Sequence, residues 1–242
     1  MSAGRVYSAV PRVQQPEEQS DPGTYGQSTR VGARRVLGGL GLGVVLLVLG
    51  LAIKSGPLTA VGTGADSAVA GLRNGLFTLG AKAVTLIATP EMWAVLGLVI
   101  PVVLVVLRRR GQALRVFGVL IGTTAVTYVA KMVVQEHRPP KHLWLETPSS
   151  ESFPSGHTAA ACAVAVMLII LAGPARKRAM TIVGGIFVAL VASSRVYLGV
   201  HYPMDTLGGA LSCVCATVFL SGLAHLPPLR RWLLVLDNHS RR

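Results

Sequence analysis

The sequence predicts an all-α fold, a bundle of six transmembrane helices with an interfacial amphipathic helix between the first and the second. Two observations lead to this prediction. Of the 242 residues, 51% are hydrophobic and only 14% are charged, with a mean hydropathy of +0.56. Long apolar stretches also alternate with short polar segments, several of which are basic. So apolar a chain is typical of a membrane protein and not of a soluble domain.

The net charge of +13 has to be explained before a nucleic-acid partner is considered. A nucleic-acid surface usually interleaves basic with aromatic residues, and aromatic residues make up only 5% of this chain. We therefore expect no nucleic-acid partner and attribute the charge to membrane topology. The three cysteines, Cys162, Cys213 and Cys215, fall within apolar runs, so they indicate neither a disulfide framework nor a metal cluster.

The N-terminal part of the chain predicts a tail followed by a membrane anchor. Residues 1–35 are rich in Gln, Ser, Pro and Arg without hydrophobic periodicity, which predicts a flexible cytoplasmic tail. Residues 36–54 form an apolar stretch long enough for a retained first crossing. In residues 55–80 apolar side chains recur at helical spacing among polar ones, which predicts the interfacial helix. A connector on the headgroups is the simpler interpretation of that helix, and a lid is the alternative.

Five further apolar stretches complete the predicted bundle. They cover residues 91–107, which a backward extension through 83–88 would lengthen, and residues 116–134, 157–173, 180–194 and 203–224. The stretch 180–194 is short against the ~20 residues that a helix needs to cross a bilayer. The membrane domain is thus predicted over residues 36–224, followed by a basic cytoplasmic tail over 225–242.

Basic residues predict the orientation of this bundle. Most of the 23 Lys and Arg residues fall in the two tails and in the loops after the second and fourth crossings. The positive-inside bias therefore places both termini in the cytoplasm of a cell whose inner membrane holds the protein. The opposite, outer face carries few basic residues, and Lys131, Arg138 and Arg195 are among them, at helix ends beside other polar residues.

Three polar segments are predicted to meet at this outer face: residues 131–139, 154–157 and 194–205. Residues 158–193 hold barely two short helices and a tight turn, so His157 and His201 should lie on one side of the membrane. Ser155 is a good N-cap for the helix that follows, and Gly156 lets a ligand approach the backbone. Free N–H groups and the positive helix end make this turn an anion site.

These residue types together indicate phosphoryl transfer. Two arginines and a lysine, Arg138, Arg195 and Lys131, could neutralise the charge that spreads over a phosphoryl group. Asp205 lies four residues after His201, across Pro203, so it can accept the imidazole N–H and orient that ring as a nucleophile. His157 would then be the general acid for the leaving oxygen.

Each of these residues alone has an ordinary interpretation. A single Lys or Arg is more often a snorkelling or interfacial anchor, an Asp a helix-start acid, and a His an interface residue. Several ionisable groups on one face of so apolar a protein favour a functional site instead. No carboxylate cluster accompanies them, so we predict a site without metal or other cofactor.

The same residues resemble a known family. Lys131 followed after six residues by Arg138-Pro139, then Pro154-Ser155-Gly156-His157, then Ser194-Arg195 with His201 and Asp205, match the three signature motifs of the type 2 phosphatidic acid phosphatase family, PAP2. The resemblance covers roughly residues 56–224. It implies a six-helix membrane enzyme in which His201 is phosphorylated and supported by Asp205 and His157 protonates the leaving group. It also implies a phosphate-binding set, which is Lys131, Arg138, Ser155, Gly156 and Arg195.

Two alternatives stay open. The family is similar to vanadium haloperoxidases, which would make the chain an oxidation catalyst, although those enzymes are soluble. A transporter or lipid-binding scaffold could use the cations to hold a phosphate headgroup without chemistry, and phosphate release in detergent would distinguish it. The expected partner is the bilayer with a lipid phosphate or diphosphate in it. Polyprenyl diphosphate, phosphatidic acid and phosphatidylglycerol phosphate are the leading candidates, and Trp144, Leu145 and the segment 56–80 are where we expect selectivity.

Overall fold

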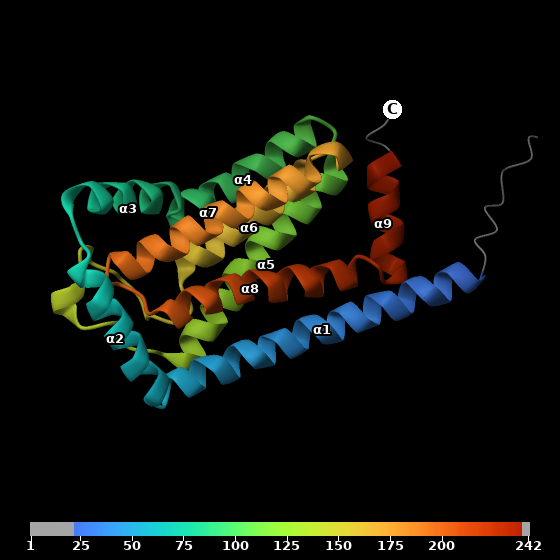
Figure 1. Ribbon diagram of the computed structural model, residues 1–242. Coiled ribbons are helices and arrows are strands. Elements are labelled where there is room, and N and C mark those ends of the chain that lie inside the picture. The colour runs from blue at the N-terminus through green and yellow to red at the C-terminus, as the bar shows by residue number, and fades with distance from the viewer. Residues whose placement is uncertain (1–21, 239–242) are drawn as a thin grey trace, which may run out of the picture.

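The computed structural model describes residues 22–238, which are mostly helical and contain no strand. The predicted all-α fold is thus confirmed for this part of the chain. The elements in chain order are α1 (Pro22–Lys54), α2 (Pro57–Gly71), α3 (Gly75–Ile87), α4 (Pro90–Val106), α5 (Arg110–Val134), η1 (Lys141–Leu143), α6 (Gly156–Leu171), η2 (Pro174–Arg176), α7 (Lys177–Tyr197), α8 (Pro203–Leu223) and α9 (Pro227–Asn238) (Figure 1).

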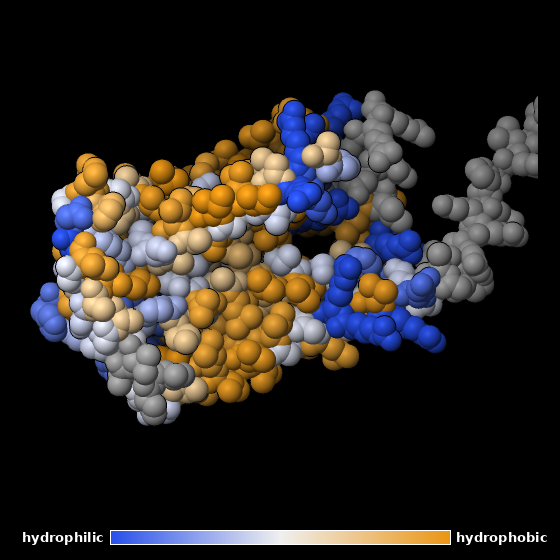
Figure 2. Space-filling model, viewed as in Figure 1, coloured by the Kyte–Doolittle hydropathy of each residue, from blue (hydrophilic) through white to orange (hydrophobic). Residues whose placement is uncertain are grey.

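The helices form a bundle with an apolar middle. In Figure 2 hydrophobic residues cover the middle of the bundle, and hydrophilic residues gather towards its two ends. Five stretches of the described residues are long and apolar enough to cross a membrane: Gly26–Lys54, Gly75–Val106, Arg110–Val134, Pro174–Tyr197 and Pro203–Leu223. Helix α6 is also apolar but has only 16 residues. The multi-pass membrane fold is confirmed, whereas the predicted number of six crossings is not.

The long helix α1 corrects the predicted N-terminal tail. We expected residues 22–35 to be flexible, but they are helical and belong to α1. The reason is packing against the end of α8: Ser28 Oγ donates to His225 O at 3.0 Å, and a Cβ on Gly222 would lie 2.8 Å from Gly32 O. Small residues let the two backbones approach closely, as is usual between membrane helices. The rest of the predicted tail, residues 1–21, lies outside the described residues.

The predicted single interfacial helix over 55–80 is wrong, because this segment forms two helices. Helix α2 ends at Gly71, and α3 begins at Gly75 after Asn74, whose side chain accepts from Phe77 N at 3.0 Å as an N-cap. Helix α3 then leads into α4, so the second crossing starts well before residue 91. The helix is interrupted between these two elements because Asn74 caps the start of α3 and because Arg73 bonds to distant carbonyls, although the apolar residues keep their helical spacing through this region.

Two further boundaries differ from prediction. Helix α7 has 21 residues, so the crossing predicted over 180–194 is not short. Much of the predicted C-terminal tail is the helix α9, which lies beside the start of α1 (Figure 1). Residues 239–242 of that tail are not among the described residues.

Helices α6 and α8 are tied together at the end of the bundle that carries the polar motifs. Ser155 N donates to Asp205 O at 2.9 Å, which joins the start of α6 to the first turn of α8. Gly209 and Gly208 give these elements room: a Cβ on Gly209 would meet Ser155 O, and one on Gly208 would meet the Phe153 ring. The fold therefore fixes the relative position of two of the three motifs before any ligand binds.

Candidate active site

The three polar segments of the sequence meet at one cavity, where α5 ends, α6 begins and α7 turns into α8. This cavity has a volume of about 780 Å³. Six of the eight predicted site residues line it, namely Lys131, Arg138, Gly156, His157, Arg195 and His201. The other two, Ser155 and Asp205, are completely buried next to it. The segments therefore converge in space as the sequence predicts.

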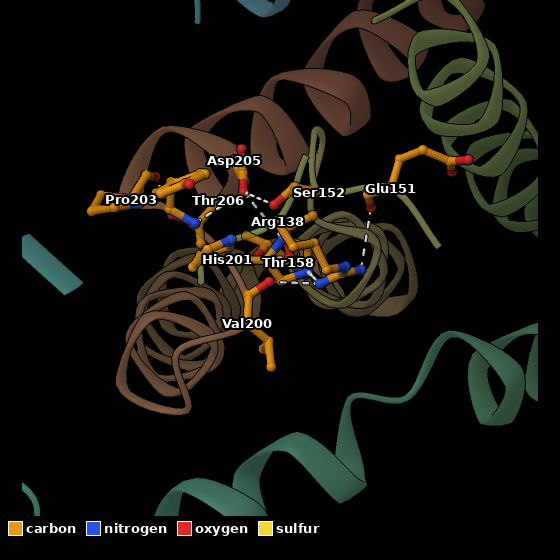
Figure 3. A network of polar contacts seen from close by, with 12 residues as sticks. Arg138, Glu151, Ser152, Thr158, Val200, His201, Pro203, Asp205 and Thr206 are labelled. Carbon is orange, nitrogen blue, oxygen red and sulfur yellow. Dashed lines mark hydrogen bonds and ion pairs between the residues drawn. The ribbon is translucent and has the colours of Figure 1, made fainter. Parts of the chain in front are cut away.

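His201 and Asp205 form a buried pair (Figure 3). The His201 Nδ1 lies 3.3 Å from Asp205 Oδ2, and the same oxygen accepts from Tyr202 N at 2.9 Å and from Ser152 Oγ at 2.5 Å. Asp205 occupies this position because α8 begins at Pro203 and the carboxylate caps its first turn. A carboxylate held in this way fixes the imidazole tautomer with its hydrogen on Nδ1.

The second nitrogen of His201 is therefore unprotonated and lies at the cavity. Its Nε2 is 3.2 Å from Arg138 Nη1, and His201 lines the cavity wall. Burial lowers the pKa of His201 well below its ordinary value of 6.5, and the positive charges of Arg138, Arg195 and Lys131 lower it further. The ring is consequently neutral near pH 7, which is the protonation state that a nitrogen nucleophile needs.

Arg138 is held by backbone carbonyls from two loops. It donates to Ser150 O at 2.6 Å, to Val200 O at 2.6 Å and to Glu151 O at 3.2 Å. Burial, followed by the charge of Arg195, lowers its pKa to about 10, so the guanidinium is still charged at neutral pH. Lys131, in the last turn of α5, donates from Nζ to the same Glu151 carbonyl. The loop before α6 thus places two cations beside His201.

Arg195 is paired with a carboxylate that the sequence did not indicate. Its Nη1 lies 2.7 Å from Glu146 Oε2 and 3.2 Å from Thr85 Oγ1 of α3. The Arg195 side chain is only 3% exposed, and its Nε has no hydrogen-bond partner. A buried guanidinium with one unused donor at a cavity wall can donate a hydrogen bond to a further oxyanion. The Glu146 carboxylate already occupies the Nη1 donor of Arg195.

The turn at the start of α6 has the predicted capping geometry. Ser155 Oγ accepts from Thr158 N at 3.5 Å and from Thr158 Oγ1 at 3.2 Å, so Ser155 is confirmed as the N-cap. Its hydroxyl is used within the cap, while Gly156 and His157 line the cavity. The first turn of α6 therefore presents backbone and imidazole to a ligand.

Sequence reasoning missed three side chains that shape the site: Ser152, Glu146 and Thr85. Ser152 donates to the Asp205 carboxylate, and the other two contact Arg195. Ser152 and Glu146 lie in a connection whose path depends on tertiary contacts, and Thr85 lies in the stretch 83–88, which the sequence indicated only as a backward extension of the second crossing. No spacing rule in the sequence could have identified them.

The charged side chains that line the cavity next to the two histidines are mainly cations, Lys131, Arg138 and Arg195. Within residues 22–238, no group of three or more His, Cys, Asp and Glu side chains is arranged to hold a metal ion. The predicted independence from metal stays a prediction that a chelator tests directly.

Comparison with known proteins finds a family and a solved structure that are similar to this chain. Residues 112–226, which contain all three polar motifs, match the model of the PAP2 superfamily. In structure the chain is similar to the crystal structure of the first transmembrane PAP2 type phosphatidylglycerolphosphate phosphatase from Bacillus subtilis, with a TM-score of 0.65 and 25% sequence identity. That similarity covers 77% of this chain and 94% of the other. The segment that carries the three motifs is therefore similar to the PAP2 superfamily, and the fold of the chain is similar to that of a PAP2 type phosphatase.

Two curated proteins are similar over shorter segments. An undecaprenyl-diphosphatase of Sulfolobus acidocaldarius is 38% identical over 88 residues, which is 34% of this chain and 41% of that protein. Phosphatidylglycerophosphatase B of Bacillus subtilis is 45% identical over 67 residues, which is 25% of this chain and 33% of that protein. The match thus spans less than half the length of each of these relatives.

Proposed function

We propose that this protein is an integral-membrane phosphatase that hydrolyses a lipid phosphate or diphosphate through a phosphohistidine at His201. The observation that carries the proposal is the position of His201 Nε2 at the wall of a cavity, 3.2 Å from Arg138 Nη1, with Asp205 Oδ2 3.3 Å from the other ring nitrogen. A neutral, oriented imidazole next to fixed cations has the arrangement that attack on a phosphoryl group requires.

The proposed reaction has two balanced steps. The His201 Nε2 lone pair attacks phosphorus, the P–O bond to the lipid breaks, and His157, which must enter this step as the imidazolium, gives its proton to the departing oxygen and becomes neutral. Asp205 stabilises the positive charge that develops on the imidazole. In the second step water attacks the phosphohistidine, His157 takes the proton of that water, the P–N bond breaks and inorganic phosphate leaves.

The cations supply the electrostatic part of the catalysis. Arg138, Arg195 and Lys131 would surround the equatorial oxygens, together with backbone N–H groups at Gly156 and His157. Their side chains are held in place in advance by carbonyl and carboxylate partners, so little reorganisation is needed when charge develops. The protein's own positive charges thereby take the place that metal ions have in many phosphoryl-transfer enzymes.

The shape of the cavity supports a lipid substrate. Beyond the cations it continues between α4 and α5, lined by apolar residues such as Trp93, Leu98, Phe117 and Leu120. Along α5 the distance from Lys131 to Phe117 is about 21 Å at the helical rise of 1.5 Å per residue. A headgroup phosphate at Lys131 would therefore leave its hydrocarbon chain in the apolar part of the same cavity.

The names of the relatives keep the candidate substrates within one chemical class. One curated relative is called an undecaprenyl-diphosphatase, the other is called phosphatidylglycerophosphatase B, and the solved structure is that of a phosphatidylglycerolphosphate phosphatase. We therefore retain polyprenyl diphosphate, phosphatidic acid and phosphatidylglycerol phosphate as candidates. The apolar part of the cavity between α4 and α5 suits a prenyl chain as well as an acyl chain.

We further propose that the site faces the outside of the cytoplasmic membrane, with six crossings that include α6. Helix α9 and the start of α1 lie at the end of the bundle opposite to α2 (Figure 1). Most Lys and Arg residues belong to these termini and to the turns at the same end, which supports a cytoplasmic location for that end.

Phosphate release from the three lipids in detergent tests the proposed function. Purified protein should release phosphate from at least one of them, and His201→Ala should release none. His142→Ala is the matched control, because His142 is an exposed histidine of η1 outside the cavity. Binding of the lipids without phosphate release would favour the scaffold or transporter, and halide oxidation with vanadate would favour the haloperoxidase.

A further inference from the structure

The short helix α2 covers the turn that carries His201. It lies across the end of the bundle next to the end of α1 (Figure 1), and it packs against α1, α7, α8 and η1. Its C-terminal end is anchored by Arg73, which donates to Tyr197 O at 3.0 Å and to Leu143 O at 2.8 Å. The end of the helix is therefore attached to the end of α7 and to η1.

One face of α2 rests on Tyr202, the residue after His201. A Cβ on Gly62 would lie 2.7 Å from Tyr202 Cδ1, so only glycine lets the ring approach the helix this closely. The Thr63 side chain makes a hydrogen bond with the Tyr202 side chain. Tyr202 in turn donates its N–H to Asp205 and accepts from Asp205 N at 3.0 Å. Any displacement of α2 would therefore shift Tyr202 and, through its hydrogen bonds with Asp205, change the geometry of the His201–Asp205 pair.

Asp66 lies one helical turn after Gly62 on the same face and is completely buried. Neither of its carboxylate oxygens has a hydrogen-bond partner. An ionised carboxylate that is buried and unpaired is very costly, whereas a protonated one is tolerated. The mechanism proposed above does not use this side chain.

The groups around Asp66 favour the protonated form. Asp205 of α8 faces Asp66 with a negative charge, and Arg73 at the end of α2 faces it with a positive one. Tyr202 also lies close to Asp66 and interacts with Glu136 as well. The titratable groups of the other neighbouring elements are Tyr197 of α7, which contacts Arg73, and Lys54, Lys141 and His142, which are exposed. Burial and the charge of Asp205 raise the pKa of Asp66 to about 7.

The two carboxyl groups have unequal partners. Asp205 accepts from Ser152 Oγ and Tyr202 N and faces His201 Nδ1, whereas Asp66 accepts from no group. Hydrogen bonds stabilise the ionised form, so of these two carboxyl groups Asp205 is the one that carries the charge and Asp66 the one that keeps a proton. Asp205 is thereby free to support a positive imidazole.

We propose that Asp66 is a positioning residue that, in its protonated form, keeps α2 docked on Tyr202 and so holds the His201–Asp205 pair in its reactive geometry. This inference rests on the proposed function for its catalytic consequence, but the docking itself does not. Loss of the proton from Asp66 would place a second negative charge beside Asp205 and weaken the docking of α2.

The direction of the pH effect follows from the raised pKa. Docking is strongest below the ordinary pKa of 3.8, where Asp66 is protonated whether α2 is docked or not. It weakens as the pH rises through the interval up to about 7, the pKa in the docked state, and does not change further above it. An uncharged residue at position 66 would remove this dependence.

Hydrogen exchange of α2, measured by mass spectrometry on the full chain in detergent, tests the proposal. Wild type and Asp66→Asn are compared at the same pH, so that the intrinsic exchange rate cancels. We expect the ratio of wild-type to variant exchange in α2 to rise at least tenfold between pH 5 and pH 7 and to be constant from pH 7.5 to pH 9. Ser67→Asn, on the exposed face of the same helix, should behave as wild type.

A ratio that is constant from pH 5 to pH 9 would overturn the proposal. If Asp66→Asn does not fold, Asp66→Leu replaces it. Wild type alone gives a second measurement, because its α2 exchange, corrected for the intrinsic rate, should rise over this interval while that of α8 does not. Phosphate release is followed in parallel, and kcat/KM should decline less with pH in Asp66→Asn. Exchange that follows this pattern without any phosphate release would refute the proposed function and leave the docking role standing.

Discussion

At the residue scale, the two histidines of the cavity have different requirements. A general acid is needed in proportion to the basicity of the leaving oxygen, whereas the nucleophile is needed whatever leaves. His157→Ala should therefore lose about 10²–10⁴-fold activity on a lipid phosphate. On nitrophenyl phosphate, whose leaving group is acidic, it should retain activity within about tenfold of wild type. His201→Ala should be inactive on both substrates.

Steady-state rates on the two substrates check this prediction, with His142→Ala as the control for a histidine outside the cavity. An equal defect of His157→Ala on both substrates, or a defect of His201→Ala confined to the lipid, would reverse the assigned roles.

The ion pair between Arg195 and Glu146 leads to a second prediction. Glu146 lies 2.7 Å from Arg195 and is 28% exposed, so its carboxylate competes with a phosphoryl oxygen for the same guanidinium. Glu146→Gln keeps the shape and removes the charge. Inhibition by vanadate should become roughly three- to tenfold tighter, equivalent to about 1 kcal/mol. Weaker inhibition would instead show that Glu146 orients Arg195 for binding.

At the element scale, the turn between α7 and α8 depends on one glycine. Gly199 has φ of 71°, a left-handed conformation that L residues with a Cβ rarely adopt. A Cβ there would also lie 2.6 Å from Arg73 Nη2 and would collide with Leu143 O. The absence of a side chain at Gly199 therefore lets Arg73 and the Leu143 carbonyl of η1 approach the turn two residues before His201.

Gly199→Ala should destabilise this turn by about 1–3 kcal/mol. The thermal midpoint should fall by on the order of 5 °C, and kcat should fall with it because His201 lies two residues further on. Gly185→Ala is the matched control, since a Cβ on that helical glycine meets nothing within 4 Å. Equal thermal midpoints for the two variants would show that the turn tolerates a side chain.

The same scale shows what the sequence could and could not predict. The capping roles of Ser155 and of Asp205 after Pro203 were predictable, because they depend on residues within one turn of each helix. The helical conformation of residues 22–35 was not, because it depends on contacts with His225 and Gly222, far along the chain. The partners of Arg195 were missed for the same reason, since Thr85 and Glu146 come from two distant segments.

At the scale of the whole molecule, the distribution of basic residues predicts the orientation in the membrane. Single cysteines at positions 141 and 109, in a background without the three native cysteines, report on the two ends of the bundle. Lys141 and Arg109 are both exposed, whereas Gly111 on the same turn is buried and unsuitable for labelling. A membrane-impermeant thiol reagent should label Lys141→Cys in intact cells and Arg109→Cys only after lysis. The reverse pattern would place the site in the cytoplasm.

The central claim is that protein cations and His201 carry out phosphoryl transfer without a metal. The most direct test mixes the purified protein, in the presence of EDTA, with a lipid phosphate that it hydrolyses. The reaction is quenched in alkali, where phosphohistidine survives, and the phosphorylated residue is located by peptide mass spectrometry. The account predicts phosphate on His201 of wild type and none in His201→Ala, with vanadate suppressing the signal. Phosphate on another residue, or turnover that stops in EDTA and returns with magnesium, would contradict it.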